Sequence, residues 1–254
     1  MKRIDLNSDM GEMPEAIADG TQESLMRSLT SVSVACGGHA GDEHTMQTTI
    51  DQALRHKAAI GAHPSYPDRA NFGRLEMNLS PEVISDAVFE QIQRLAQIAA
   101  RSGAPIVHVK AHGALYNQAA RDGAIAEAIA RGVARWSRDV VLVGLAGSLM
   151  IEVFRSAGFR VASEAFADRR YEPDGSLRSR QFVDALVSDP AEAAQQALRI
   201  AKRGSVLAHD GSEVAVTAQT ICIHSDTPGA PAIAAAVAAT LRQAGVALLP
   251  LSAV

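Results

Sequence analysis

Short runs of β-branched and aliphatic residues alternate along the chain with longer segments in which Ala, Leu and Ile recur at helical spacing. The short runs predict eight strands, at residues 3–7, 32–36, 59–63, 106–110, 140–144, 160–164, 219–224 and 246–249. Helices are expected in most of the gaps. Two helix starts are marked by a capping residue followed by proline, at Ser80-Pro81-Glu82 and at Asp189-Pro190-Ala191-Glu192, and the second predicts a capping box.

The alternation continues to the end of the chain without a linker, so residues 1–254 are expected to form one domain. Strands that alternate with helices form parallel sheets, and seven or eight such units can close into a barrel. An open doubly wound sheet is the alternative. The barrel is favoured because strands that should be buried on both faces carry polar residues on one face, as where His108 and Lys110 alternate with Val107 and Val109. We predict a single-domain TIM-like (β/α) barrel with seven or eight strands.

Two stretches interrupt the alternation, at residues 64–79 and 165–184. Loops of this length inside a compact domain are usually functional or mobile, so either stretch is a candidate lid. An unrecognised strand or helix would also explain the second stretch.

Four of the eight histidines lie at or just after predicted strand ends, each near Gly or Pro: His39, His63, His112 and His224. The C-terminal ends of barrel strands converge on one mouth, where barrel enzymes carry their active sites. We therefore expect these four side chains to share a site, and we expect the remaining histidines, including His108, to be structural.

Carboxylates follow the same strand ends, at Asp9, Glu12, Asp42, Asp68, Glu164, Asp168 and Asp226. A carboxylate beside imidazoles can act as general base for a water molecule or can hold a divalent metal, and the sequence leaves both roles open. Asp9, His63 and His112 form the candidate metal triad. Asp42 could equally cap a helix.

Cationic residues near the predicted mouth are Lys110, Arg69, Arg74, Arg169 and Arg170. Lys110 is expected to point inward from its strand, and it would then need a partner such as Glu164 or a substrate carboxylate. The chain has neither a GxxxxGK[ST] loop nor a GxGxxG segment after a strand, so no phosphate cradle for a nucleotide is expected.

Composition excludes several classes of function. The chain has 47% hydrophobic, 20% charged and 4% aromatic residues and a formal charge of −4, so nucleic acid is not an expected partner. The longest nearly apolar run, residues 230–241, is too short to span a membrane. The N-terminus carries no apolar signal core, so we expect a cytoplasmic protein in which Cys36 and Cys222 are free, semi-buried thiols.

Six strand-end segments occur in a characteristic order, at 5–12 (DLNSDMGE), 35–42 (ACGGHAGD), 61–68 (GAHPSYPD), 110–117 (KAHGALYN), 164–169 (EAFADR) and 222–228 (CIHSDTP). Together they resemble the LamB/YcsF family from the first strand to the last helix. The resemblance implies a barrel related to the glycoside hydrolase and deacetylase barrels. It also implies activity as the A subunit of a bacterial 5-oxoprolinase, which uses ATP to open 5-oxo-L-proline, a small anionic lactam, to L-glutamate.

Two further subunits, B and C, belong to that enzyme, and they would handle the co-substrate ATP. Under this hypothesis Asp9, His112, His63 and Glu164 are the expected catalytic residues, and the loop at 165–184 closes over the site. The expected substrate-binding residues are Asn7, His39, Lys110, Asn117, Arg74, Asp168, Arg169, His224 and Asp226. The alternatives are a stand-alone metal-dependent carbohydrate deacetylase or amidase, and a substrate-binding subunit without chemistry of its own.

Overall fold

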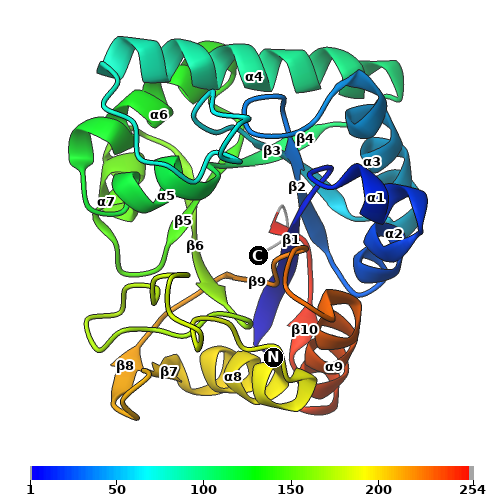
Figure 1. Cartoon of the computed structure of the whole chain (residues 1–254), viewed down its shortest axis with the longest axis vertical. Coiled ribbons are helices and arrows are strands. Elements are labelled where there is room, and N and C mark those ends of the chain that lie inside the picture. Colours follow the sequence, from blue (N-terminus) through cyan, green and yellow to red (C-terminus); the bar gives the residue numbers. More distant parts are fainter. Residues whose placement is uncertain (1, 252–254) are drawn as a thin grey trace.

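Seven parallel strands close into a barrel in the computed structural model, which describes residues 2–251 (Figure 1). The ring runs β1-β2-β3-β4-β5-β6-β9, and β9 closes it by pairing with both β6 and β1. The barrel strands are β1 Arg3–Met10, β2 Ser31–Ala35, β3 Ala59–His63, β4 Ile106–Lys110, β5 Val141–Leu145, β6 Arg160–Phe166 and β9 Thr220–Cys222. The predicted barrel is therefore confirmed with seven strands.

The eighth predicted strand does not enter the ring. It corresponds to β10 (Ala247–Leu248), which pairs with Arg3 and Ile4 at the start of β1. The sequence does not predict a short antiparallel hairpin formed by β7 (Ser205–Leu207) and β8 (Glu213–Ala215). With three residues in each strand, this hairpin is too short to produce a periodic pattern of apolar residues.

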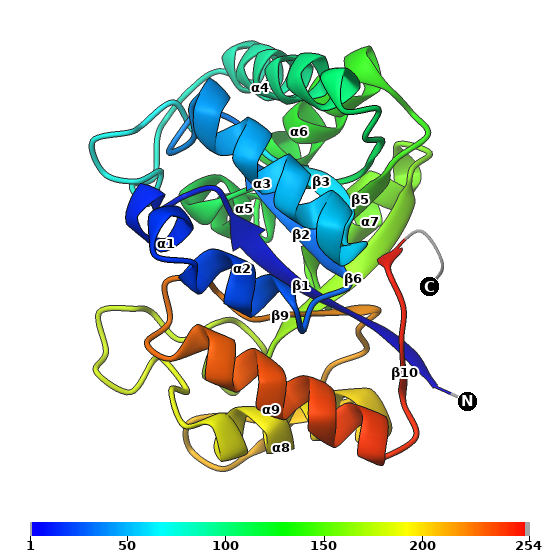
Figure 2. The same ribbon diagram turned by 90° about the vertical axis from the view of Figure 1, so that its right-hand side faces the viewer.

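Helices surround the barrel, and Figure 2 shows α9 lying beside α8 below it. The helices are α1 Pro14–Ala18, α2 Thr21–Met26, α3 Glu43–His56, α4 Pro81–Arg101, α5 Gly113–Ala119, α6 Gly123–Trp136, α7 Leu149–Ser156, α8 Pro190–Arg203 and α9 Ala230–Gln243. None of the helices within residues 2–251 is long and apolar enough to cross a membrane.

Side-chain caps mark the helix starts that the sequence indicated. The Ser80 and Asp189 side chains accept hydrogen bonds from the backbone N–H groups at the third position of α4 and α8. The capping box predicted for α8 is only half formed, because the Glu192 carboxylate binds Arg170 at 2.8 Å. Asp42 caps α3 in a complete capping box with Thr45.

The barrel interior contains polar side chains where the strand alternation placed them. The ring of His108 is fully buried, and its Nε2 atom lies 3.3 Å from Ser33 Oγ. A Cβ atom at Gly61 would lie 2.2 Å from this ring, so β3 needs glycine here. Burial lowers the pKa of His108 to about 3, so the ring is neutral and structural, as predicted.

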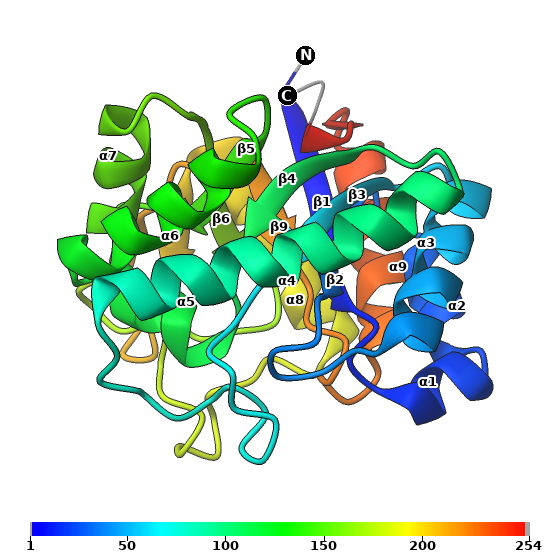
Figure 3. The same ribbon diagram turned by 90° about the horizontal axis from the view of Figure 1, so that it is seen from above.

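The two irregular stretches lie at one end of the molecule, as Figure 3 shows for residues 64–80 and 167–189. Within the second stretch the chain forms isolated bridges, including Arg169 with Leu186 and Tyr171 with Leu177. Cys36 and Cys222 are free but completely buried, which corrects the prediction of semi-buried thiols. Both end up inside because they lie where strands meet the barrel interior.

Candidate active site

A cavity of about 1030 Å³ opens at the C-terminal ends of the barrel strands. Residues at the ends of β1, β3, β4, β5 and β6, residues of α5 and β8, and the loops that follow the strands form its wall. Its charged and polar lining residues include Asp9, Glu12, His63, Arg74, Glu76, Lys110, His112, Tyr116, Asn117, Arg121, Arg169, Asp174, Arg180, His224 and Asp226. The predicted convergence of polar strand ends on one mouth is confirmed.

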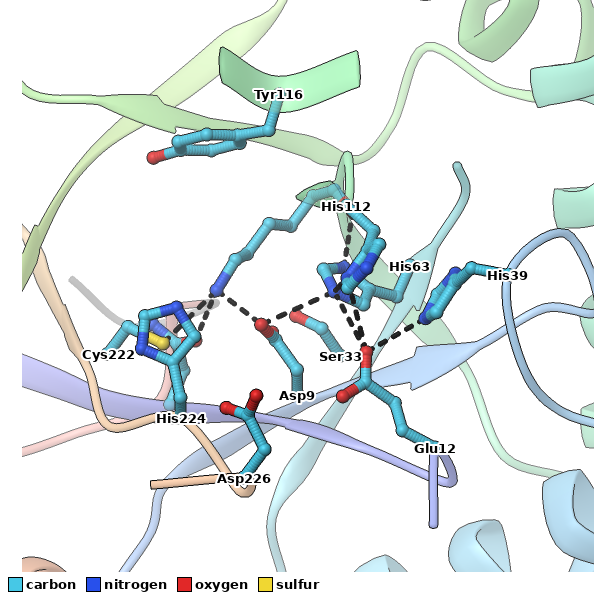
Figure 4. A network of polar contacts seen from close by, with 12 residues as sticks. Asp9, Glu12, Ser33, His39, His63, His112, Tyr116, Cys222, His224 and Asp226 are labelled. Atoms are coloured by element: carbon cyan, nitrogen blue, oxygen red, sulfur yellow. Dashed lines mark hydrogen bonds and ion pairs between the residues drawn. The ribbon is translucent and has the colours of Figure 1, made fainter. Parts of the chain in front are cut away.

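Glu12 lies at the centre of a buried cluster with three histidines, drawn in Figure 4. Its Oε1 atom lies 2.8 Å from His39 Nε2, 3.2 Å from His112 Nδ1 and 3.7 Å from His63 Nε2. The His63 Nε2 and His112 Nδ1 atoms are themselves 3.0 Å apart. We call Glu12, His39, His63 and His112 the histidine cluster.

The backbone around the histidine cluster positions its members. Gly11 has a φ of +75°, so the chain turns sharply directly after β1 and before Glu12. His63 is the last residue of β3, and His112 is the N-cap of α5. His39 lies in the loop between β2 and α3.

Hydrogen bonds to backbone carbonyls orient two of the rings. His63 donates from Nδ1 to the Lys110 carbonyl at 2.8 Å, and His112 donates from Nε2 to the Phe72 carbonyl at 2.9 Å. In the neutral rings, the opposite nitrogens carry lone pairs, and these two lone pairs face each other across 3.0 Å beside Glu12. Two facing lone pairs repel, so this position favours a bound proton or a metal cation between them.

The pKa values in the cluster follow burial and the neighbouring charges. Burial lowers the pKa of His39 to about 4, which keeps its ring neutral. Burial also acts to lower the pKa of His63, but the Asp9 and Glu12 carboxylates outweigh it and raise that pKa above its ordinary value. Burial opposes ionisation of Glu12, yet hydrogen bonds from His112, which donates when a proton occupies its Nδ1 atom, and from His39 hold the pKa of Glu12 far below the usual range. The cluster therefore presents a carboxylate to three imidazoles.

Asp9 connects the histidine cluster to a second group of charges centred on Lys110. Its Oδ2 atom lies 3.3 Å from His63 Nε2, and its Oδ1 atom lies 2.9 Å from Lys110 Nζ. Lys110 Nζ also lies 2.8 Å from Glu164 Oε1, 3.2 Å from Asn7 Oδ1 and 3.3 Å from Cys222 Sγ. An ammonium group has three protons, and polar atoms of this chain already accept them.

The opposite side of the cavity is formed by His224 and the residues that hold it. Its ring stacks on Phe166 with centroids 5.2 Å apart. Asp168 accepts hydrogen bonds from His224 Nδ1 at 3.0 Å, from the His224 backbone N–H at 2.8 Å and from Thr227 Oγ1 at 2.6 Å. This arrangement leaves Nε2 of His224 available to the cavity, and Asp168 acts as its positioning residue.

Three loops meet at the rim through one carboxylate. Asp226, after β9, forms ion pairs with Arg74 from the loop after β3 and with Arg180 from the loop after β6. Arg180 binds Asp226 through both of its Nη atoms, at 2.7 and 3.3 Å. These contacts join the two candidate lids predicted from the sequence.

The structure divides the predicted site residues into two groups. Asp9, His63, His112, Lys110, Asn117, Arg74, Arg169, His224 and Asp226 line the cavity. Asn7, His39, Glu164 and Asp168 are buried behind that wall and contact residues that line it.

Several cavity residues are absent from the predicted site, among them Glu12, Tyr116 and Arg180. The sequence marks Glu12 only as one of several strand-end carboxylates, whereas its donor atom groups with His39, His63 and His112. Asp9, predicted to complete the metal triad, instead groups with Cys222 and His224. Tyr116 donates from its hydroxyl to Glu164 at 2.9 Å, and it lies within the segment KAHGALYN that already indicates the site.

Comparisons with known proteins agree along the whole chain. The model of the LamB/YcsF family matches residues 4–254. The 5-oxoprolinase A subunit of Chloroflexus aggregans is 48% identical over 246 residues, which are 97% of this chain and 98% of that protein. The 5-oxoprolinase A subunit of Bordetella pertussis is 46% identical over 245 residues, covering 96% of this chain and 97% of that protein.

A solved structure extends this similarity to three dimensions. The lactam utilization protein from Thermus thermophilus is 42% identical and superimposes with a TM-score of 0.91, covering 98% of this chain and 100% of that one. The family model and these relatives match nearly the full length of the chain, so the match includes the whole barrel. The chain belongs to the LamB/YcsF family.

Proposed function

We propose that this chain is the A subunit of a cytoplasmic 5-oxoprolinase and that it opens the lactam of 5-oxo-L-proline to L-glutamate together with partner subunits B and C. One observation carries the proposal: relatives that match nearly the whole chain are named as this component of 5-oxoprolinase. The buried acid–base site that faces the cavity is consistent with that activity. ATP would be handled by the partners, because the chain carries no recognisable phosphate-binding loop.

The residues of the cavity supply the groups that hydrolysis of a cyclic amide needs. Water must attack the lactam carbonyl, the C–N bond must break, and the ring nitrogen must gain a proton. Asp9 is the proposed general base. Ion pairs with His63 and Lys110 overcome its burial and hold its pKa well below the usual range, which keeps it ionised but makes it a weak base, so a proton that it takes from water must pass on to His63. When no metal occupies their facing nitrogens, His112 and His63 are placed to carry protons between this base and the ring nitrogen.

Glu164 and Lys110 are proposed to position the site rather than to bind the substrate. Burial favours the neutral amine, but Asp9, Cys222 and Glu164 raise the pKa of Lys110 well above its ordinary value, so this residue stays an ammonium ion. Its contacts with Asp9 and Glu164 orient the Asp9 carboxylate toward His63. The substrate carboxylate would have to displace one of these partners to reach Lys110.

The histidine cluster fits a divalent metal. Its donor atoms all lie within 4.8 Å of one another, and four of their separations, 2.8 to 3.7 Å, bracket the ~3.3 Å edge of a tetrahedron with metal–ligand bonds of ~2.0–2.1 Å. Backbone carbonyls hold the other nitrogens of His63 and His112, as is usual for metal-bound histidines. A metal held by only three of these donors, with a position left open to the cavity, would supply Lewis acidity toward a carbonyl oxygen.

The proposed function is tested by measuring ATP-dependent glutamate release from 5-oxo-L-proline, with the purified chain alone and with its two presumed partners added. We expect release only from the mixture. Asp9→Asn and His112→Ala should each reduce turnover by at least ~100-fold, the usual range for a lost general base or acid. Full activity of both variants in the assembled enzyme would show that the site is wrong.

A stand-alone metal-dependent amidase or carbohydrate deacetylase is the second candidate, and the histidine cluster is the observation that favours it. The same assay separates the two. If folded partners were present and no glutamate were released, while the metal-loaded chain alone hydrolysed an N-acetylated sugar, the second candidate would replace the first.

A further inference from the structure

Five cationic side chains from lysine and arginine line the cavity: Arg74, Lys110, Arg121, Arg169 and Arg180. Four of them form ion pairs with carboxylates of this chain. Arg74 and Arg180 bind Asp226, Arg121 binds Glu76, and Lys110 binds Asp9 and Glu164. For Arg169, residues 2–251 provide no carboxylate within ion-pair distance.

Arg169 is also deeply buried, with only 7% of its surface exposed. Among the described residues, the Arg169 side chain makes one hydrogen bond, from Nη2 to the Arg178 carbonyl at 2.6 Å, and its Nε atom is buried without a partner. Burying a charge without a partner is costly, so buried charges in proteins are normally paired. Such an unpaired guanidinium in the wall of a cavity indicates a ligand that brings the missing anion.

The surroundings of Arg169 favour a small anion over a neutral group. Burial lowers the pKa of this guanidinium to about 10, and the like charge of Arg180 contributes in the same direction. Even so, Arg169 remains charged at neutral pH. Two carboxylates lie near the pair of guanidinium groups, but both are engaged elsewhere: Asp226 binds Arg74 and Arg180, and Asp168 accepts hydrogen bonds from His224 and Thr227.

We propose that Arg169 is the specificity-determining residue that receives the carboxylate of the lactam substrate. Arg180 is its neighbour on the same loop. This inference rests on the proposed function, because 5-oxo-L-proline carries one carboxylate beside the lactam ring. Guanidinium groups bind carboxylates through paired, charge-assisted hydrogen bonds. Anchoring at Arg169 would leave Lys110 to its partners Asp9 and Glu164.

The test compares Arg169→Gln, Arg169→Lys and the matched control Arg170→Gln in the assembled enzyme. Arg170 is the next residue, but it binds Glu192 of α8. We expect the KM for 5-oxo-L-proline to rise about 10- to 100-fold in Arg169→Gln, the range for one lost charge-assisted interaction, with a much smaller change in kcat. Arg169→Lys should recover part of the loss, and Arg170→Gln should stay within about twofold of the parent.

Ligand binding to the isolated chain is a second measurement, and it would not change if Arg169 had only a structural role. 5-Oxo-L-proline should raise the melting temperature of the parent chain, whereas 2-pyrrolidinone, the same lactam without its carboxylate, should raise it far less. Arg169→Gln should melt at the parent's temperature without ligand and should lose the difference between the two lactams. An equal rise with inorganic phosphate would indicate a general anion site and would contradict the proposal.

The two hypotheses fail in different ways. A parent enzyme without glutamate release would overturn the proposed function, and the melting experiment would still decide the role of Arg169. An active parent enzyme together with an unchanged KM in a folded Arg169→Gln variant would overturn the assignment of Arg169 alone. If the parent chain bound neither lactam, the assignment would also be wrong.

Discussion

The ring of His39 lies parallel to the ring of His112, with centroids 3.6 Å apart and an angle of 3° between the planes. Both rings direct a nitrogen at Glu12 Oε1. Two stacked imidazolium ions would repel, and the lowered pKa of His39 agrees with a neutral ring. Histidines bind metals through neutral rings, so the neutral ring of His39 suits a metal ligand.

Metal binding is the first prediction from this arrangement. After treatment with a chelator and reloading with zinc or manganese, the purified chain should retain about one ion per chain after dialysis, measured by elemental analysis. Glu12→Ala and His63→Ala should each retain far less, because each removes a donor from the histidine cluster.

His56→Ala is the control for this experiment, because His56 contacts Glu23, away from the cavity lining. Its metal content should equal that of the parent chain. Equal metal content in Glu12→Ala and the parent would contradict the assignment, and retention of the ion in Glu12→Ala with loss in Asp9→Ala would restore the triad predicted from the sequence.

Loss of the Lys110 charge should destabilise the barrel. Lys110→Met would leave the carboxylates of Asp9 and Glu164 buried without their cation. Breaking a buried ion pair in this way costs about 3–5 kcal/mol. We expect that loss in the free energy of unfolding, measured with urea, and the double variant Lys110→Met/Glu164→Gln should lose less than the sum of the two single variants.

A surface ion pair provides the comparison for Lys110. Arg101 binds Glu43 between α4 and α3, and both side chains are more than half exposed. Arg101→Met should therefore cost less than about 1 kcal/mol. If both variants lost the same free energy of unfolding, the buried ion pairs of Lys110 would contribute no more to stability than a surface ion pair.

Much of the barrel could be predicted from the sequence because its strands are short apolar runs between helical segments. The inward direction of Lys110 follows from alternation with Val109, and Glu164 is one of the two partners that the sequence suggests for it. The position of β10 could not be predicted, because pairing outside the ring depends on where the barrel closes and not on the residues of β10. That residues 1–254 form one domain stays a prediction.

The site was harder to predict than the fold, for local reasons. Whether Glu12 reaches the histidines depends on the turn at Gly11, and sequence spacing carries no information on that turn. Arg169 has no carboxylate partner among the described residues because of the way the irregular stretch at 167–189 folds over the mouth, and the sequence does not indicate that conformation. Alternation along a strand indicated which side chains point inward, as for Lys110, whereas the partners of those side chains and of the loop residues required the structure.

The stability of the folded chain should depend on pH through Asp5. This carboxylate is fully buried and accepts hydrogen bonds from Thr30, Ser31 and Thr220. Burial raises its pKa from 3.8 to about 6, with a further increase from Glu164, although the hydrogen bonds act in the opposite direction.

Because the pKa of Asp5 is higher in the folded state than in the unfolded state, protonation favours folding. The contribution of Asp5 is complete below about pH 4 and is lost as the pH rises through about 6. Between pH 7.5 and pH 5 the free energy of unfolding should therefore gain ~1 kcal/mol from this group. Urea unfolding of the parent and of Asp5→Asn at both pH values tests this, since the gain should be smaller by that amount in the variant. An identical pH dependence would place the Asp5 pKa near its ordinary value.

Gly61→Ala should destabilise the barrel by driving a methyl group into the ring of His108. The added Cβ atom would lie 2.2 Å from that ring, and overpacking of this kind costs about 1–3 kcal/mol or more. Gly123→Ala is the control, because its nearest neighbour would lie 3.6 Å away and its backbone suits alanine. In the double variant Gly61→Ala/His108→Ala the clash is removed, so the two substitutions should interact by ~1–3 kcal/mol in a double-mutant cycle. Additive losses would show that β3 moves away from His108 instead of pressing against it.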